Sequence, residues 1–280
     1  MNHRLYLLLI LAALAFLTAV EARGQDKAAA PRVPSTFPGV SSVLWVAAHP
    51  DDETMPAPLL SRLCLDEGLR CTFLVFTRGE KGVCDLPGGC RPDLGTVRAA
   101  EMARAAPLFH ARLIQWRYPD GGAAANGSAG SWDTTAGSHA ALLSSLQGVI
   151  TRTGANLVLT FDPRHGTTCH PDHRAVGGLV LEALAAMNRP PLAYLLETRL
   201  VTDSSPVALH FLPAALATAG VFTFDGNSTW KTLEADIQIH ASQFDTSIRR
   251  AVSRVPTAER AVYLGPPELL LAANDVTTCP

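Results

Sequence analysis

Apolar runs typical of buried strands alternate along this chain with segments of helical periodicity. The expected strands span residues 43–48, 71–77, 113–118 and 156–161. The expected helices that follow them span residues 53–68, 96–109, 138–153 and 171–187. Strands that alternate with helices favour a parallel, doubly wound sheet, because parallel neighbours need a crossover connection.

After residue 191 the pattern changes to shorter pieces. Strands are expected at 192–201, 208–212 and 220–224, and a longer helix at 229–249. We therefore predict an α/β fold, with a Rossmann-like, mostly parallel sheet flanked by helices and a C-terminal extension of mixed strands and helix. The 280 residues are enough for one large domain with a full core.

The first 22 residues have the build of a secretory signal peptide. Arg4 precedes a long apolar run, and small residues follow it near Ala19 and Ala22. The run falls short of the ~20 residues that span a bilayer, although an uncleaved membrane anchor is the alternative. We predict a secreted or periplasmic protein without a stable membrane anchor after cleavage. A flexible segment at 23–42 would then lead into one domain at 43–280.

The charge balance limits the partners. The formal net charge is -2 at pH 7, which gives no electrostatic reason to bind nucleic acid or an anionic membrane. We expect a small or neutral substrate instead. The sequence does not indicate an oligomeric state.

Six cysteines, an even number in a chain with an export signal, predict disulfides rather than free thiols. Short loops favour Cys64 with Cys71 and Cys84 with Cys90, which leaves Cys169 to pair with Cys279. No pair has the CxxC spacing of a structural zinc site.

Residues 121–137 are rich in Gly, Ala, Ser and Asn and offer little apolar surface for packing. Because the segment follows a strand end, it could be a lid over a binding crevice. A passive surface insertion is an equally good interpretation.

Two short polar motifs each follow an expected buried strand. They are Ala48-His49-Pro50-Asp51-Asp52-Glu53 and His170-Pro171-Asp172-His173. Ligands of open α/β sheets collect outside the carboxyl ends of the strands, so the two motifs can meet in one crevice. The imidazole and carboxylate side chains of the two motifs are the ligand types of catalytic divalent metals, so the motifs indicate such a site.

Six polar residues of the motifs can be given a role in such a site. His49, Asp52 and His173 would supply two imidazoles and a carboxylate as ligands. Asp51 would act as the general base beside the metal-activated water. His170 could donate a hydrogen bond to a developing oxyanion, and Asp172 could accept one from an imidazole and so orient it.

At these residues the chain resembles the PIG-L/LmbE-like family, the zinc-dependent de-N-acetylases of N-acetylglucosamine-containing compounds. Both the AHPDDE and the HPDH motifs of the family are present. Weaker matches agree in order along the chain: a Gly-containing loop at 77–82, Arg98-x-x-Glu101, a Pro-Asp-Gly turn at 119–121 and His240-x-Ser242-Gln243.

The resemblance implies the zinc ligands, the base and the oxyanion partner that were assigned above from the residues alone. It also implies that Arg98 and Asp120 contact the sugar or its substituent, although Arg98 could instead pair with Glu101 and Asp120 could only cap a turn. The chain departs from the family at two places. Residues 55–58 replace a small, Gly-rich stretch, and Thr168 stands where some members have a carbonyl-polarising tyrosine.

The leading hypothesis is an exported zinc-dependent hydrolase that removes the N-acetyl group from an N-acetylated amino sugar or glycoconjugate. Other divalent metals could replace zinc, because two imidazoles and a carboxylate also accept iron, cobalt or manganese. Two alternatives stay open. One is an amidase for a different N-acyl conjugate, and the other is a carbohydrate-binding protein that keeps the metal without turnover.

Overall fold

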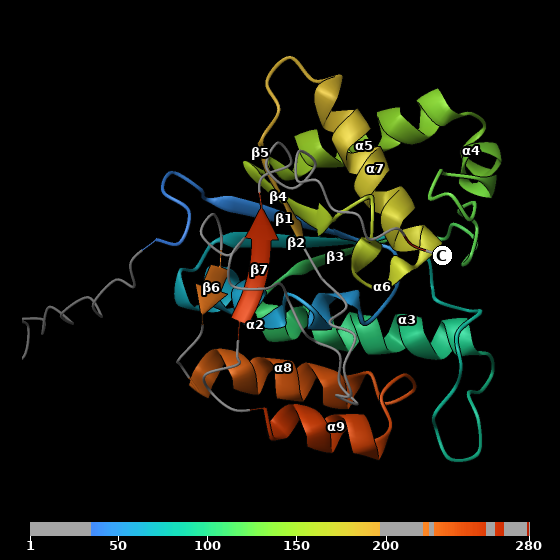
Figure 1. Cartoon of the computed structure of the whole chain (residues 1–280), viewed down its shortest axis with the longest axis vertical. Helices are drawn as coiled ribbons and strands as arrows, with labels where there is room; N and C mark the ends of the chain where they lie inside the picture. Colours follow the sequence, from blue (N-terminus) through green and yellow to red (C-terminus); the bar gives the residue numbers. More distant parts are fainter. Residues whose placement is uncertain (1–34, 197–220, 224–226, 256–260, 266–278, 280) are drawn as a thin grey trace, which may run out of the picture. The chain divides into compact units, whose positions relative to one another are not determined.

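The computed structural model describes residues 35–196, 221–223, 227–255, 261–265 and 279 (Figure 1). The predicted signal peptide and the strand expected at 208–212 lie outside these residues. In the described part of the chain, no helix is both long and apolar enough to cross a membrane.

A seven-stranded sheet in the order β3-β2-β1-β4-β5-β7-β6 forms the centre of the domain. Its strands are β1 (Ser42–Ala47), β2 (Arg70–Val75), β3 (Arg112–Gln115), β4 (Leu157–Phe161), β5 (Leu192–Leu196), β6 (Val221–Thr223) and β7 (Ala261–Gly265). The first five pair in parallel, whereas β7 runs antiparallel to both β5 and β6. The predicted α/β class, with a mixed C-terminal extension, is confirmed.

Helices cover both faces of the sheet (Figure 1). One face packs against α5 (His139–Thr153) and α7 (Pro171–Ala185), with Leu146 and Val180 in its core. The opposite face packs against α2 (Ala57–Ser61), α3 (Leu94–Ala105) and α8 (Asn227–Ile239), with Leu60 and Leu233 in its core. Strands buried on both sides explain why β1 and β4 read as continuous apolar runs.

Short elements complete the fold around this frame. They are η1 (Asp52–Thr54), η2 (Arg62–Asp66), η3 (Ala106–Phe109), α4 (Ser131–Ala136), α6 (Gly166–Cys169) and α9 (Thr246–Ser253). The single helix expected at 53–68 is therefore divided into η1, α2 and η2. Pro56 and Pro58 lie at the start of α2, where a proline removes no helical hydrogen bond.

The long helix expected at 229–249 is also divided, and that prediction was wrong. Helix α8 ends at Ile239, and α9 begins only at Thr246. Asp245 is the N-cap of α9, where its side chain accepts a hydrogen bond from the Ile248 amide at 2.8 Å. The residues between the two helices turn inward toward the functional site.

The domain begins before the expected boundary at residue 43. Phe37 is 5% exposed and packs edge-on against Tyr194, so residues 35–42 belong to the folded unit. The three predicted disulfides, Cys64–Cys71, Cys84–Cys90 and Cys169–Cys279, are confirmed.

Candidate metal centre and active site

The sheet brings the two polar motifs together. Strands β1 and β4 are parallel neighbours, so the loops that follow their carboxyl ends lie at the same edge of the sheet. Successive strands are added on one side of β1 up to β3 and on its other side from β4 onward. This reversal of strand order is the position where α/β proteins bind ligands.

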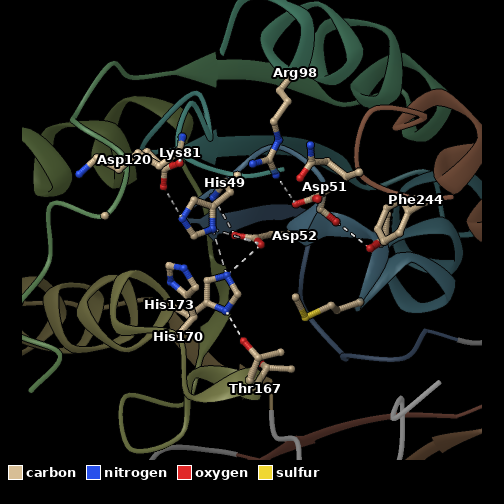
Figure 2. Close-up of a pocket in the computed structure, with 16 residues that line it drawn as sticks. His49, Asp51, Asp52, Lys81, Arg98, Asp120, Thr167, His170, His173 and Phe244 are labelled. Atoms are coloured by element: carbon tan, nitrogen blue, oxygen red, sulfur yellow. Dashed lines mark hydrogen bonds and ion pairs between the residues drawn. The ribbon is translucent and has the colours of Figure 1, made fainter. Parts of the chain in front are cut away.

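His49, Asp52 and His173 direct one atom each toward a common point (Figure 2). His49 Nδ1 lies 3.1 Å from His173 Nε2, and His173 Nε2 lies 3.0 Å from Asp52 Oδ1. The third separation, His49 Nδ1 to Asp52 Oδ1, is 3.7 Å. All three residues are buried.

The other polar atom of each of these three side chains is held by the protein. Asp52 Oδ2 accepts hydrogen bonds from the amides of Ala48 and His49. His173 Nδ1 donates to the Gly166 carbonyl at 2.8 Å. His49 Nε2 lies 3.2 Å from Asp172 Oδ2 and 3.1 Å from Asp120 Oδ1. The free atoms are therefore the three that converge.

This arrangement fits a divalent metal. Two imidazole nitrogens and a carboxylate oxygen are a common donor set for catalytic zinc, and ligand atoms about 3.3 Å apart match a tetrahedral site with ligand bonds of about 2.0–2.1 Å. Burial alone would raise the pKa of Asp52, but His173 and His49 outweigh it and hold that pKa well below its usual value. The carboxylate is thus ionised and able to bind a cation.

Asp51 stands beside the ligands in an unusual backbone conformation. Its φ of 91° is in the left-handed region, which a non-glycine residue occupies only when its surroundings impose it. Arg98 forms an ion pair with Asp51 Oδ1 at 3.0 Å, and donates to the carbonyls of Pro50 and Gly79. Burial raises the pKa of Asp51, while Arg98 counteracts part of that effect.

His170 is the exposed member of the group, and its ring lies 4.7 Å from that of His49. His170 Nδ1 accepts a hydrogen bond from the Asp172 amide at the start of α7. In the neutral imidazole the proton must then be on Nε2, where it can be donated to a ligand. Although the residue is exposed, partial desolvation of its ring and the neighbouring His49 lower the pKa of His170, which favours this neutral form.

Asp172 and Asp120 both face His49. Asp172 also accepts hydrogen bonds from the amides of Gly121 and Ala123, so it joins α7 to the 121–137 segment. Asp120 Oδ2 accepts from the Lys81 amide at 2.7 Å. The imidazole that Asp172 contacts is therefore that of His49. The sugar contacts expected of Arg98 and Asp120 stay predictions.

A cavity of about 440 Å³ opens over these groups (Figure 2). Its lining contains all the predicted site residues except Asp172, which lies behind His49. Further lining residues are Met55, Lys81, Gly82, Gly121, Thr168 and Gln243, which belong to stretches compared with the family, and Thr54, Thr167 and Phe244, which the sequence did not single out. The cavity size is in the range of small-molecule sites, roughly 300–1,000 Å³.

The 121–137 segment is fixed to the domain rather than loosely attached. Trp132 in α4 is fully buried, packs against Phe76 and donates its indole N–H to the Pro119 carbonyl at 2.8 Å. The sequence contained this one large aromatic residue within a run of small ones, and its anchoring effect was missed.

A second buried polar cluster lies under the site, formed by Glu53, Asp236 and His240. All three side chains are fully buried, and His240 Nε2 lies 2.6 Å from Glu53 Oε1. Burial lowers the pKa of His240, but Glu53 and Asp236 raise it to about 9. Burial and Glu53 raise the pKa of Asp236 well above its usual value. The sequence had marked Glu53 as the end of the AHPDDE motif and His240 as the start of the His-x-Ser-Gln stretch, but it gave no sign that the two meet.

Comparisons with known proteins identify the family of this chain. The model of the PIG-L family, described as GlcNAc-PI de-N-acetylase, matches residues 44–184. A 1D-myo-inositol 2-acetamido-2-deoxy-alpha-D-glucopyranoside deacetylase of Gordonia bronchialis is 30% identical over 201 residues, which cover 62% of this chain and 67% of that protein.

Solved structures share the fold at low sequence identity. An N,N'-diacetylchitobiose deacetylase from Pyrococcus horikoshii has a TM-score of 0.60 at 15% identity, covering 85% of this chain and 88% of that one. GalB, a 4-carboxy-2-hydroxymuconate hydratase from Pseudomonas putida, has a TM-score of 0.57 at 17% identity, covering 85% and 98%. Proteins of this fold therefore catalyse two different reactions, so the fold alone does not identify the family. The match of the family model to the sequence does. On that match, which spans both polar motifs, this chain belongs to the PIG-L family of metal-dependent de-N-acetylases.

Proposed function

We propose that this chain hydrolyses the N-acetyl group of an N-acetylglucosamine-containing substrate outside the cytoplasm, giving acetate and a free amine. The observation that carries the proposal is the convergence of His49, Asp52 and His173 beside Asp51 in one cavity. Export is inferred from the signal-like N-terminus and is supported by three disulfides, which are typical of oxidising compartments.

His49 Nδ1, Asp52 Oδ1 and His173 Nε2 would hold the metal, and zinc is the ion that this donor set suits best. When bound there, a divalent metal supplies Lewis-acid polarisation of the amide carbonyl and a water of lowered pKa. The remaining chemistry belongs to the side chains around the ligands.

Asp51 is suited to move the proton of the reaction. It is 18% exposed toward the cavity, and Arg98 holds one of its oxygens in place. Asp51 would take a proton from the attacking water as a new C–O bond forms, and then pass that proton to the amine as the C–N bond breaks. A carboxylate whose pKa is raised by burial is a stronger base toward the water proton, and it keeps that proton until the amine accepts it.

His170 would stabilise the negative charge that develops on the carbonyl oxygen. Its Nε2–H is free for this because Nδ1 accepts from the Asp172 amide. Thr168, which stands in the place of the family's tyrosine, also lines the cavity, and its hydroxyl lies 3.4 Å from His173 Nδ1. We assign the oxyanion role to His170.

An acetate-release assay tests the proposal. The full chain, supplied with zinc, is incubated with N-acetylglucosamine, its oligomers and N-acetylglucosaminides of rising size. We expect acetate and amine in equal amounts, and loss of at least 1,000-fold of the rate in Asp51→Asn with bound metal unchanged. Sugar binding without acetate release would identify a carbohydrate-binding protein, and release only from longer N-acyl groups would identify an amidase of different specificity.

A further inference from the structure

The cluster of Glu53, Asp236 and His240 supports the turn that carries the catalytic carboxylates. Glu53 directly follows Asp51 and Asp52 in the sequence, and its side chain points away from the cavity into the interior. His240, 187 residues later in the chain, meets it with Nε2 2.6 Å from Glu53 Oε1. Asp236, one helical turn before His240, lies 3.7 Å from the same nitrogen.

The turn needs such support because it is strained. Asp51 has a positive φ, and η1 is only one short turn of 3-10 helix. Arg98 holds the cavity side of the turn through Asp51 and the Pro50 carbonyl. The hydrogen bond to Glu53 holds the interior side.

The residues after His240 are fixed in the same way. Ser242 donates hydrogen bonds to Glu101 on α3 through its amide and its hydroxyl, and Gln243 and Phe244 reach the cavity lining. Since α3 also carries Arg98, one helix connects the two ends of this network. The inward turn between α8 and α9 is thus attached to the site at two carboxylates, Glu53 and Glu101.

We propose that His240 is a positioning residue for catalysis: its hydrogen bond to Glu53 holds the strained turn in the geometry that presents Asp51 and Asp52 to the cavity. Asp236 lies 3.7 Å from the same His240 nitrogen, beside this hydrogen bond. The proposal rests on the proposed function, in which Asp51 is the base.

The same three side chains could in principle bind a second cation, but the distances favour a direct bond. A separation of 2.6 Å between nitrogen and oxygen is that of a short charge-assisted hydrogen bond, and it leaves no room for an ion between the two atoms. Metal binding at the cluster is therefore an outcome that the experiment has to distinguish.

Two double variants of the full chain test the proposal. Glu53→Gln with His240→Gln keeps a hydrogen bond between neutral amides, whereas Glu53→Met with His240→Leu fills similar space without one. Each variant removes the two charges of the Glu53–His240 pair together, so neither charge is left buried without the other, and both variants are expected to fold. A variant with Leu146→Ala, a core residue of α5 that does not line the cavity, is the control for general loss of stability.

At saturating zinc we expect kcat for acetate release to fall about 10- to 100-fold in the Met/Leu pair, with KM unchanged and one metal ion still bound, and to stay within about threefold in the Gln/Gln pair. Leu146→Ala should lose stability with its kcat unchanged. Equal kcat in the two double variants would overturn the proposal, and so would loss of a second equivalent of metal in the Met/Leu pair. An inactive wild type, or a fully active Asp51→Asn, would instead refute the proposed function.

Discussion

Removing the Cys169–Cys279 disulfide should destabilise this protein far more than removing Cys84–Cys90. The first bond joins residues 110 positions apart and the second joins residues 6 apart. In the chain-entropy model a disulfide acts mainly by restricting the unfolded chain, with about 4.7 kcal/mol for a loop of this longer length and about 2.3 kcal/mol for the shorter one. The expected difference is therefore about 2.4 kcal/mol.

The two bonds make a matched comparison. All four cysteines are partly buried, so Cys→Ser replacement changes local solvation to a similar degree at each. Urea unfolding of the Cys169→Ser/Cys279→Ser and Cys84→Ser/Cys90→Ser variants, followed by circular dichroism, gives both free energies of unfolding. Equal losses in the two variants would refute the loop-entropy argument.

The longer disulfide also has a consequence for the site. Cys169 has a φ of 59° and directly precedes His170, and Thr167 in the same turn has a φ of 69°. Releasing Cys169 allows this strained turn to relax, which would move the His170 imidazole away from the cavity. We expect a lower kcat in the Cys169→Ser/Cys279→Ser variant under conditions in which it is still folded.

Three further perturbations have defined outcomes. Arg98→Met should move the acidic limb of the kcat/KM profile to higher pH, because Arg98 lowers the pKa of Asp51 and this base must be ionised to act. An unchanged acidic limb would show that Arg98 does not control the ionisation of Asp51. Trp132→Ala should lower the free energy of unfolding by about 3–5 kcal/mol in urea titrations, since it empties a fully buried site; a loss below 1 kcal/mol would mean that the 121–137 segment is not anchored there. The pKa of His240 is raised to about 9 from a usual 6.5, so its protonated ring stabilises the fold fully below pH 6.5, and this stabilisation is lost as the pH rises through 9. The urea midpoint should therefore fall between pH 7 and 9.5 in the wild type, and fall less in His240→Gln. Parallel curves for the two proteins would contradict this.

The sequence predicted the parts of the structure that depend on local pattern. Strands β1 and β4 were identified because they are buried on both faces, and the motifs after them because parallel strand ends share an edge. The three disulfides followed from loop length and an even count of cysteines.

Features that depend on distant partners could not be predicted in this way. Arg98 could have paired with Glu101 three residues later, but its partners are Asp51 and the carbonyls of Pro50 and Gly79. Glu101 instead binds Ser242, 141 residues away. The division between α8 and α9 has the same origin, because the burial of His240 against Glu53 is invisible in the helical periodicity of the segment.

The proposed chemistry depends on one metal ion bound by His49, Asp52 and His173. Anomalous diffraction at the zinc absorption edge, from crystals of the full chain grown with zinc, locates such an ion. We expect one strong peak about 2.0–2.2 Å from His49 Nδ1, Asp52 Oδ1 and His173 Nε2. A peak between Glu53, Asp236 and His240, with none at the first site, would contradict it.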